Sequence, residues 1–485
     1  MNFECKIIKE SNLFFGNNRA TIDPKVGLMK YGPYGILETD FTPITITAGV
    51  IATDEYFDNL KIWLERLSYR IEGRTIIDSD VRSIDFPGIN KESPLKFEIK
   101  ILDSAVETIK KEELSKALES DDRKERILKI FNIYKQKFSD MAVNDPKPNI
   151  ILLPIDEEII DNCKDTRFVQ DKIVYERRTF DRSKKYEDVP LFDFHNALKV
   201  LAIKYSMITQ IILPNTLKFS DDVQDEATIA WNFAVAIYYK GTGIPWKLAE
   251  VDDQTCFVGL SFYQEISRET RNMRTSMAHV YMKTGESQII RGNSFRWDTD
   301  QGLSPQLSEK DAWKIISDVI SLYQRQKSKL PRRIVIHKSS HFSEGEISGF
   351  NRATKGIELV DYVHILLHSD IRSFSEGFNY PPIRGTFFGR ENYWILYTTG
   401  FIPSIGTYPG ATIPEPLGIE IVKKDSNYYT ILKDILALTK LDWNTADFCR
   451  REPVTLSVSR KVGEILSELR ENDIIEPPPG YRYYM

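Results

Sequence analysis

The stretch that decides the fold spans residues 333–341 and reads RIVIHKSSH. Its β-branched residues at 334–336 follow a lysine- and arginine-rich segment and a proline, which predicts a buried strand. In α/β domains such a strand often presents a functional group at its carboxyl end. Here the chain presents Ser339 and Ser340, so this is either an active site or a place where one is missing.

The segments before this strand predict the domain in which it lies. Three strands follow one another at residues 255–265, 275–285 and 286–292, and residues 308–326 have the spacing of an amphipathic helix. Three consecutive strands, a helix and a further strand are typical of an RNase H-like fold. The second half of the chain is therefore predicted to be an α/β domain of this kind.

The first half of the chain alternates between strand and helix patterns, which predicts a parallel α/β layer up to about residue 250. The expected strands lie at residues 43–53, 146–155 and 207–213, and the expected helices lie at 54–67, 105–139, 195–206 and 226–240. The segment GIPWKLAEVDDQ, at 243–254, marks the expected junction between the two halves.

The composition is that of an ordinary globular chain. Its 485 residues are enough for two or three domains, and none of its apolar runs is long enough to span a membrane. The net charge of −5 argues mildly against nucleic-acid binding, although a basic groove can lie within an acidic total. The four cysteines form no CxxC pair and the amino terminus lacks the apolar stretch of a signal peptide, so we expect a cytoplasmic protein.

Four polar residues in the first half have the spacing of an anion pocket. His195 and Lys199 are four residues apart and share one helix face, Gln210 follows on the next strand, and Lys240 ends the next helix. Two cationic or donor side chains, an amide and a lysine suit a phosphate. The alternative is a solvated helix face, with Lys240 compensating the negative end of its helix.

Two basic sets in the second half are candidates for contact with a nucleic-acid backbone. One is Arg268, Arg271 and Arg274, after the strand at 255–265, and the other is the group of lysines and arginines at 325–333. Either set is also what an ordinary solvated surface provides.

The strand ends lack the carboxylates that RNase H-like nucleases use to hold two divalent ions. The positions where they are expected carry Ser261 and Ser339, and a neutral hydroxyl is a weak ligand for such ions. The alternative is a site that uses displaced acids nearby, namely Glu265, Glu344 or Glu346.

From about residue 190 to the end, the chain resembles the MID and PIWI domains of an Argonaute. The resemblance rests on these segments in order: HNALK (195–199), TQIIL (209–213), GIPWKL (243–248), CFVGLSF (256–262), QIIRG (288–292), RIVIHKSS (333–340), YPPIRGT (380–386), TYPG (407–410), LTKLDWN (438–444) and REPVTLSVSRKVGEIL (451–466). It implies a Rossmann-like MID domain over 1–250, with an amino-terminal lead-in segment, and an RNase H-like PIWI domain over 251–485. Since this leaves no room for separate N or PAZ domains, the match is to short prokaryotic Argonautes.

The resemblance implies that His195, Lys199, Gln210 and Lys240 hold the 5′-phosphate of a guide strand. In the family the carboxyl terminus also enters this pocket, often beside a divalent ion, so Met485 is expected to supply a carboxylate ligand for Mg²⁺. The chain departs from the family at Ala236, where relatives place a polar ligand or a second lysine. Asn232 lies one turn further back on the same face.

The catalytic residues of the family do not carry over. Ser261 and Ser339 stand where the family has metal-binding aspartates, and the fourth position falls near residues 457–459, which offer no carboxylate or histidine. The resemblance therefore implies an inactive PIWI domain that binds but does not slice, so this chain is not expected to be an enzyme.

The function implied is that of a sensor in prokaryotic defence against plasmids or phage. The expected partners are a guide RNA (or DNA), a complementary single-stranded DNA target, and an APAZ-containing effector protein with a TIR or sirtuin-type NADase domain. The effector is expected to form a heterodimer with this chain and to be activated, often through higher oligomers, when the target binds. The alternatives are a metal-dependent guided nuclease with displaced carboxylates and a free-standing guide-binding protein.

Overall fold

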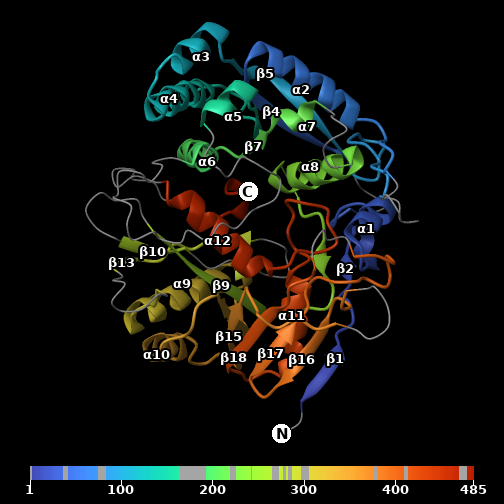
Figure 1. The fold of residues 1–485 in the computed structure, drawn as a ribbon, viewed down its shortest axis with the longest axis vertical. Helices are drawn as coiled ribbons and strands as arrows, with labels where there is room; N and C mark the ends of the chain where they lie inside the picture. Colours follow the sequence, from blue (N-terminus) through green and yellow to red (C-terminus); the bar gives the residue numbers. More distant parts are fainter. Residues whose placement is uncertain are drawn as a thin grey trace.

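The protein forms two α/β layers, one above the other in Figure 1, with the last residue of the sequence between them. The computed structural model describes residues 3–36, 42–74, 83–163, 193–218, 225–241, 243–264, 272–276, 280–281, 287–296, 305–374, 381–408, 413–468 and 478–485. No helix in these ranges is long and apolar enough to cross a membrane.

The described helices are α1 (Pro24–Tyr31), α2 (Asp54–Leu67), α3 (Lys111–Leu118), α4 (Arg123–Ala142), α5 (Glu157–Cys163), α6 (Phe194–Lys204), α7 (Pro214–Leu217), α8 (Glu226–Gly241), α9 (Glu309–Lys327), α10 (Glu344–Ala353), α11 (Tyr428–Leu438) and α12 (Val454–Leu466), with 3-10 turns η1 (Gly16–Asn18) and η5 (Tyr481–Tyr483). The described strands are β1 (Glu4–Ile7), β2 (Leu13–Phe14), β3 (Ala20–Thr21), β4 (Ile44–Ala52), β5 (Phe97–Thr108), β6 (Ile150–Pro154), β7 (Thr209–Ile212), β8 (Lys247–Leu248), β9 (Thr255–Gln264), β10 (Asn272–Ser276), β11 (Val280–Tyr281), β12 (Ser287–Gln288), β13 (Ser294–Arg296), β14 (Arg333–Lys338), β15 (Leu359–Leu366), β16 (Thr386–Arg390), β17 (Tyr393–Leu396) and β18 (Leu417–Lys423).

The upper layer is the parallel sheet β5-β4-β6-β7, covered by helices on both faces. Successive residues of a strand point to opposite faces, so β4 serves two cores. Ile46, Ala48 and Val50 pack in a cluster that includes Trp231 of α8, whereas Ile51 packs in a second cluster with residues of α3 to α6. The strands and helices expected at residues 43–67 and at 195–240 are confirmed.

The prediction of a helix over residues 105–139 is wrong for its first residues. Residues 105–108 extend β5, and Val106 lies opposite Val50 of the central strand β4. Ala105 is fully buried. Pairing with β4 therefore outweighs the helical preference of this segment, and the helical part is divided into α3 and α4.

The lower layer is an 11-stranded sheet whose main path runs β1-β16-β17-β18-β15-β14-β9-β10-β13. Strand β9 pairs antiparallel with β10 and with β11. On its other side β9 lies parallel to β14, which in turn lies parallel to β15. This is the predicted RNase H-like arrangement, with RIVIH in the centre of the sheet and all six residues of β14 buried. Helices α9 and α10 lie together on one face of this sheet, and α12 packs against β9.

The amino-terminal segment begins in the lower layer and runs from there toward the upper one. Strand β1 pairs antiparallel with β16 of the lower sheet, and β2 pairs with β8 and β3 in a small sheet of three strands. Lys440 fixes this segment, because its buried amine donates to the main-chain oxygen of Ile22 at 2.6 Å. The division at residue 250 stays a prediction, and the first residues described belong to the lower sheet.

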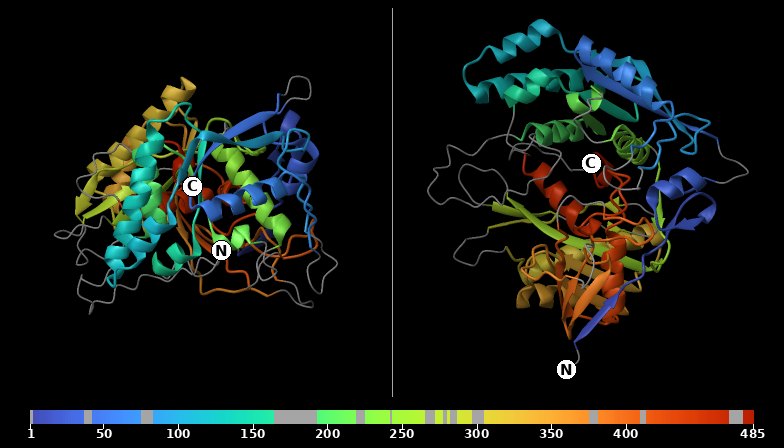
Figure 2. Two further views of the ribbon diagram at one scale, coloured as in Figure 1. Left: turned by 90° about the horizontal axis from the view of Figure 1, so that it is seen from above. Right: turned by 45° about the vertical axis from the view of Figure 1, so that its right-hand side comes forward.

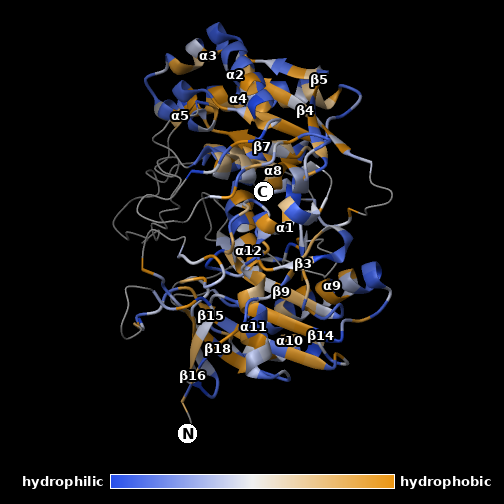
Figure 3. Ribbon diagram, turned by 90° about the vertical axis from the view of Figure 1, so that its right-hand side faces the viewer, coloured by the Kyte–Doolittle hydropathy of each residue, from blue (hydrophilic) through white to orange (hydrophobic). Residues whose placement is uncertain are grey.

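The two layers meet along α6, α8 and α12. Figure 2 shows these helices between the sheets in two further views, and Figure 3 shows hydrophobic residues gathered on the strands and on the inner sides of the helices. Main-chain and side-chain contacts join α6 to α12: the amide of Asp193 donates to Glu468 at 3.0 Å, and the Asn196 side chain donates to the Glu464 carbonyl at 3.5 Å. The first residues of α6 are thus held by the carboxyl-terminal helix.

Candidate nucleic-acid interface

The first turns of α6 present the predicted cationic face. Asp193 caps the helix by accepting a hydrogen bond from the Asn196 amide, which fixes where the helix begins. His195 and Lys199 follow on one face, and Lys199 is only 2% exposed. The alternative of a solvated helix face is wrong for Lys199, because its amine lies inside the protein.

Lys199, Gln210 and Lys240 meet at the start of β7. The Lys199 Nζ donates to the Thr209 carbonyl at 2.7 Å, and the Lys240 Nζ donates to the same carbonyl at 3.1 Å. Lys240 also donates to the Gln210 Oε1 at 2.7 Å. Three of the four residues predicted from spacing therefore form one hydrogen-bonded group, which we call the lysine pocket.

His195 stands beside the lysine pocket and is half-buried. Burial, followed by the charge of Lys199, lowers the pKa of His195 to about 3. The imidazole is therefore neutral at physiological pH, so it acts as a hydrogen-bonding group and not as a further cation.

The positive charges of the lysine pocket oppose one another in a dry setting. Burial and, to a lesser extent, the charge of Lys461 lower the pKa of Lys199 to about 7. Burial and the charges of Lys199 and Lys461 also bring the pKa of Lys240 well below its ordinary value. The oxygens that accept from these amines belong to Thr209, Met485 and Gln210. An anion bound here would relieve this repulsion and restore both amines to the charged form.

Lys461 is a pocket residue that the sequence did not reveal. It lies on α12, whose sequence contributes to the resemblance to Argonautes but was not predicted to supply a residue of the lysine pocket. Its charge acts on His195, Lys199 and Lys240, so it lies close to all three. Only the packing of α12 on α6 brings it there, and no local spacing in the sequence indicates that packing.

The last residue of the sequence reaches the lysine pocket, where the resemblance to Argonautes implies that it lies. Met485 is 4% exposed, and its main-chain oxygen accepts a hydrogen bond from the Lys199 Nζ at 2.5 Å. Figure 1 places this end of the chain between the layers, beside α6 and α8. The Ile289 amide donates to the Pro479 carbonyl at 2.7 Å, and this bond ties the segment down.

The residues around the lysine pocket fit a magnesium ion poorly. The Met485 oxygen is already bonded to an amine, and Ala236 offers no ligand atom. Asn232 is engaged elsewhere, because its Oδ1 accepts from the Thr445 hydroxyl at 2.8 Å and from the Ala446 amide at 2.9 Å. Amines repel a cation, whereas Mg²⁺ needs hard anionic oxygens. The expected Mg²⁺ at Met485 stays a prediction, and the lysine pocket suits an anion without it.

Ser261 lies within β9, beside the end of the neighbouring strand β14, which Ser339 follows. The register pairs Leu260 of β9 with Lys338 of β14, so the two serines come one residue later on adjacent strands. Ser261 is 8% exposed and Ser339 is exposed. Gly259 allows α12 to approach this point, because a Cβ there would lie 2.0 Å from the Thr455 oxygen. The two positions therefore adjoin on neighbouring strands.

Two of the displaced acids can be placed, and Glu346 is not free to bind metal. Glu346 is fully buried and accepts from the Lys338 Nζ at 2.6 and 2.7 Å. It also completes the capping box of α10 with Ser343. Glu344 is exposed at the start of the same helix, and Glu265 lies outside the described residues.

The candidate backbone-binding arginines are placed only in part. Arg268 and Arg271 lie outside the described residues, and of Arg274 only the main chain is described, in β10 opposite Tyr263. Arg333, from the second basic set, is not a surface residue. Its guanidinium pairs with Asp361 at 2.8 Å and with Asp434 at 2.5 Å in the interior, so its interpretation as a nucleic-acid contact is wrong.

Parallel-sheet and RNase H-like layers joined in this way have the MID and PIWI fold of the Argonautes. Residues 188–379 match the family model described as the Piwi domain. The chain is 25% identical over 355 residues to the protein argonaute of Aquifex aeolicus (strain VF5), covering 71% of this chain and 46% of that protein.

Solved structures share the fold over nearly the whole chain. Clostridium butyricum Argonaute, bound to a guide DNA and a 19-mer target DNA, matches with a TM-score of 0.66 at 15% identity, covering 99% of this chain and 55% of that chain. Drosophila Piwi matches with a TM-score of 0.62 at 14% identity, covering 99% of this chain and 56% of that chain. The chain spans about half the length of these relatives. Together the matches show a Piwi-domain match over residues 188–379 and an Argonaute-like fold over nearly the whole chain.

Proposed function

We propose that this chain is a guide-binding Argonaute of the short prokaryotic type, which anchors the 5′-phosphate of a guide strand and does not slice the target. The single observation that carries the proposal is the lysine pocket, in which Lys199 and Lys240 are buried together and share the Thr209 carbonyl.

A terminal phosphate is the ligand that suits this group best. It carries negative charge and several acceptor oxygens, whereas the lysine pocket offers amine donors and neutral His195. Gln210 supports the arrangement, because its Oε1 orients Lys240 at 2.7 Å. Phosphates along a nucleic-acid backbone are less able to enter, since Lys199 is only 2% exposed. A chain end reaches a buried pocket more easily than a chain interior does.

The experiment compares guides that differ only at the 5′ end. Purified protein is titrated with one RNA sequence carrying either a 5′-phosphate or a 5′-hydroxyl, and with the DNA version of each. We expect the wild-type chain to prefer the phosphate, and Lys199→Glu to abolish the preference by placing a negative charge against the ligand. Lys204→Glu is the matched control, because Lys204 lies on the same helix and is exposed. If the preference survives Lys199→Glu, the pocket assignment is wrong.

We propose further that the lower layer holds a guide–target duplex without cutting it. The support is that Ser261, within β9, and Ser339, directly after β14, lie on neighbouring strands at positions where two divalent ions would need carboxylates. Glu346 offers no substitute, because both its oxygens accept from Lys338. Base pairing would supply the sequence specificity, as in other guided systems. Guide-dependent cleavage that is lost in Glu344→Gln would overturn this part and favour the displaced-carboxylate nuclease.

The effector is proposed to reside on another polypeptide, an APAZ protein with a TIR or sirtuin-type NADase domain, as the resemblance to short Argonautes implies. The proposed guide is RNA and the proposed target is single-stranded DNA. Co-expression with the adjacent open reading frame tests this: we expect a stable complex whose NADase activity rises when guide and complementary target are both present. A chain that purifies alone and gains no activity from its neighbour would instead be a free-standing guide-binding protein.

A further inference from the structure

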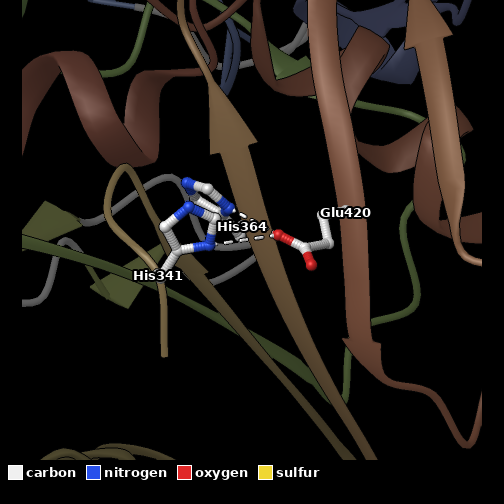
Figure 4. A group of neighbouring side chains, drawn as sticks. All are labelled: His341, His364 and Glu420. Atoms are coloured by element: carbon white, nitrogen blue, oxygen red, sulfur yellow. Dashed lines mark hydrogen bonds and ion pairs between the residues drawn. The ribbon is translucent and has the colours of Figure 1, made fainter. Parts of the chain in front are cut away.

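Two histidines and a glutamate meet on the lower sheet, away from the lysine pocket. His341 lies in the loop after β14, His364 lies on β15 and Glu420 lies on β18. The ligand atoms of all three lie within 4.8 Å of one another, and Figure 4 shows both imidazoles turned toward the carboxylate. The His364 Nδ1 is 2.8 Å from the Glu420 Oε2, and the His341 Nδ1 is 3.4 Å from the same oxygen.

This cluster lies on the opposite face of the sheet from Ser261, and His364 hydrogen-bonds to the main chain of Ser339. Lys338 pairs with His364 in register, and Lys338 reaches Glu346 of α10. Residues paired in register point to the same face, so His364 lies on the α10 side. His337, one residue before Lys338, instead bonds to Thr455 of α12.

Ser261 follows Leu260, and Leu260 pairs with Lys338. Ser261 therefore points to the α12 side, together with His337. A ligand held by His341, His364 and Glu420 would thus have the sheet between itself and Ser261.

We propose that His341, His364 and Glu420 bind a divalent transition-metal ion of the zinc class. Imidazole nitrogens favour zinc and its neighbours, whereas Mg²⁺ and Ca²⁺ favour sites made of oxygen alone. Zinc bonds to nitrogen and oxygen are about 2.0–2.2 Å long, so tetrahedral ligand atoms lie about 3.3–3.5 Å apart. The 3.4 Å between His341 and Glu420 already fits this spacing, and the 2.8 Å at His364 needs to open by about half an ångström.

The exposure of the three groups suits such an ion. The His341 side chain is 71% exposed, and that of Glu420 is 41% exposed, whereas His364 is buried at 4%. The site is therefore anchored on the sheet by His364 and open to solvent on the other side, with room for a water as fourth ligand. A bound ion would fix the loop that carries Ser339 and His341 to β18.

Zinc binding to the intact chain tests the proposal. The protein is stripped with a chelator and titrated with Zn²⁺ against a chromophoric chelator, with Co²⁺ absorption spectra as a second readout of nitrogen and oxygen ligation. We expect one ion per chain, unaffected by millimolar Mg²⁺. His341→Ala is expected to weaken binding by about 100-fold or more. Because His341 is exposed, the fold should survive this change.

His368→Ala is the matched control. His368 is also an exposed histidine next to a glutamate, at 3.4 Å from Glu415, but among the described residues it belongs to no cluster of three ligands. We expect His368→Ala to bind Zn²⁺ as tightly as the wild type does. We expect Glu420→Gln to lose as much affinity for Zn²⁺ as His341→Ala. If the wild type binds no stoichiometric ion, or if His341→Ala binds as tightly as the wild type, the site does not exist. Neither readout involves guide binding, so the result is independent of the proposed function.

Discussion

Replacing Lys199 with methionine should weaken phosphate binding without weakening the free protein. The gap between the ordinary pKa of 10.5 and the folded value of about 7 corresponds to about 5 kcal/mol against the charged form. Methionine keeps the length of the side chain and removes the charge. It also removes the hydrogen bond to Met485, at a cost of about 1–2 kcal/mol, whereas the Thr209 carbonyl keeps Lys240 as a donor. The free energy of unfolding of Lys199→Met should therefore exceed that of the wild type by about 3 kcal/mol near pH 6.5.

The stability of the wild type should also depend on pH in a way that the stability of the variant does not. Between about pH 7 and 10.5, the unfolded chain holds a proton on Lys199 that the folded chain has lost. The free energy of unfolding of the wild type therefore rises with pH across this window, and Lys199→Met lacks that contribution. Urea unfolding at pH 6.5, 8 and 9.5 measures both curves. A variant that is less stable than the wild type at pH 6.5, or one with the same pH slope, would refute the reasoning.

The same variant should bind a 5′-phosphorylated guide less well. A unit charge about 4 Å away, at an effective dielectric constant of about 20, contributes about 4 kcal/mol. Part of that is offset because the variant no longer suffers repulsion from Lys240 and Lys461. A loss of at least about 2 kcal/mol, or about 30-fold in affinity, should remain in a binding titration. An unchanged affinity would mean that Lys199 does not face the ligand.

Further predictions concern the lower sheet. Glu346→Gln leaves the Lys338 amine buried without its partner and should lower the free energy of unfolding by about 3–5 kcal/mol, measured by urea unfolding. Gly259→Ala brings a Cβ within 2.0 Å of the Thr455 oxygen, so α12 must shift and the melting temperature should fall by several degrees. Arg332→Ala, by contrast, removes an exposed ion pair and should change the free energy of unfolding by less than about 1 kcal/mol. A much larger loss of stability would contradict the expectation that solvent screens this pair.

The sequence predicted those features that depend on local spacing and on the order of elements. The four-residue interval between His195 and Lys199 was enough to place both on one face of α6. The order of strands and helices around RIVIH was enough for the RNase H-like sheet. Residues 105–108 were misassigned because pairing with β4 decides their conformation, and pairing between distant strands has no local signal.

For the same reason, the sequence could not predict side-chain contacts between distant segments. Lys461 joins the lysine pocket only because α12 packs on α6. Arg333 appeared to be one of a basic group, and only the fold shows Asp361 and Asp434 around it. His341 ends the stretch RIVIHKSSH, but its partner Glu420 lies on a strand formed much later in the chain.

The most direct test of the central claim is a target-retention assay with the intact chain, a 5′-phosphorylated RNA guide, a labelled complementary single-stranded DNA and Mn²⁺ or Mg²⁺. We predict that the target is retained only with the matching guide and is recovered at full length, because Ser261 and Ser339 offer no metal-binding carboxylate. Retention that does not depend on the guide, or a product cut at a position set by the guide, would contradict the account.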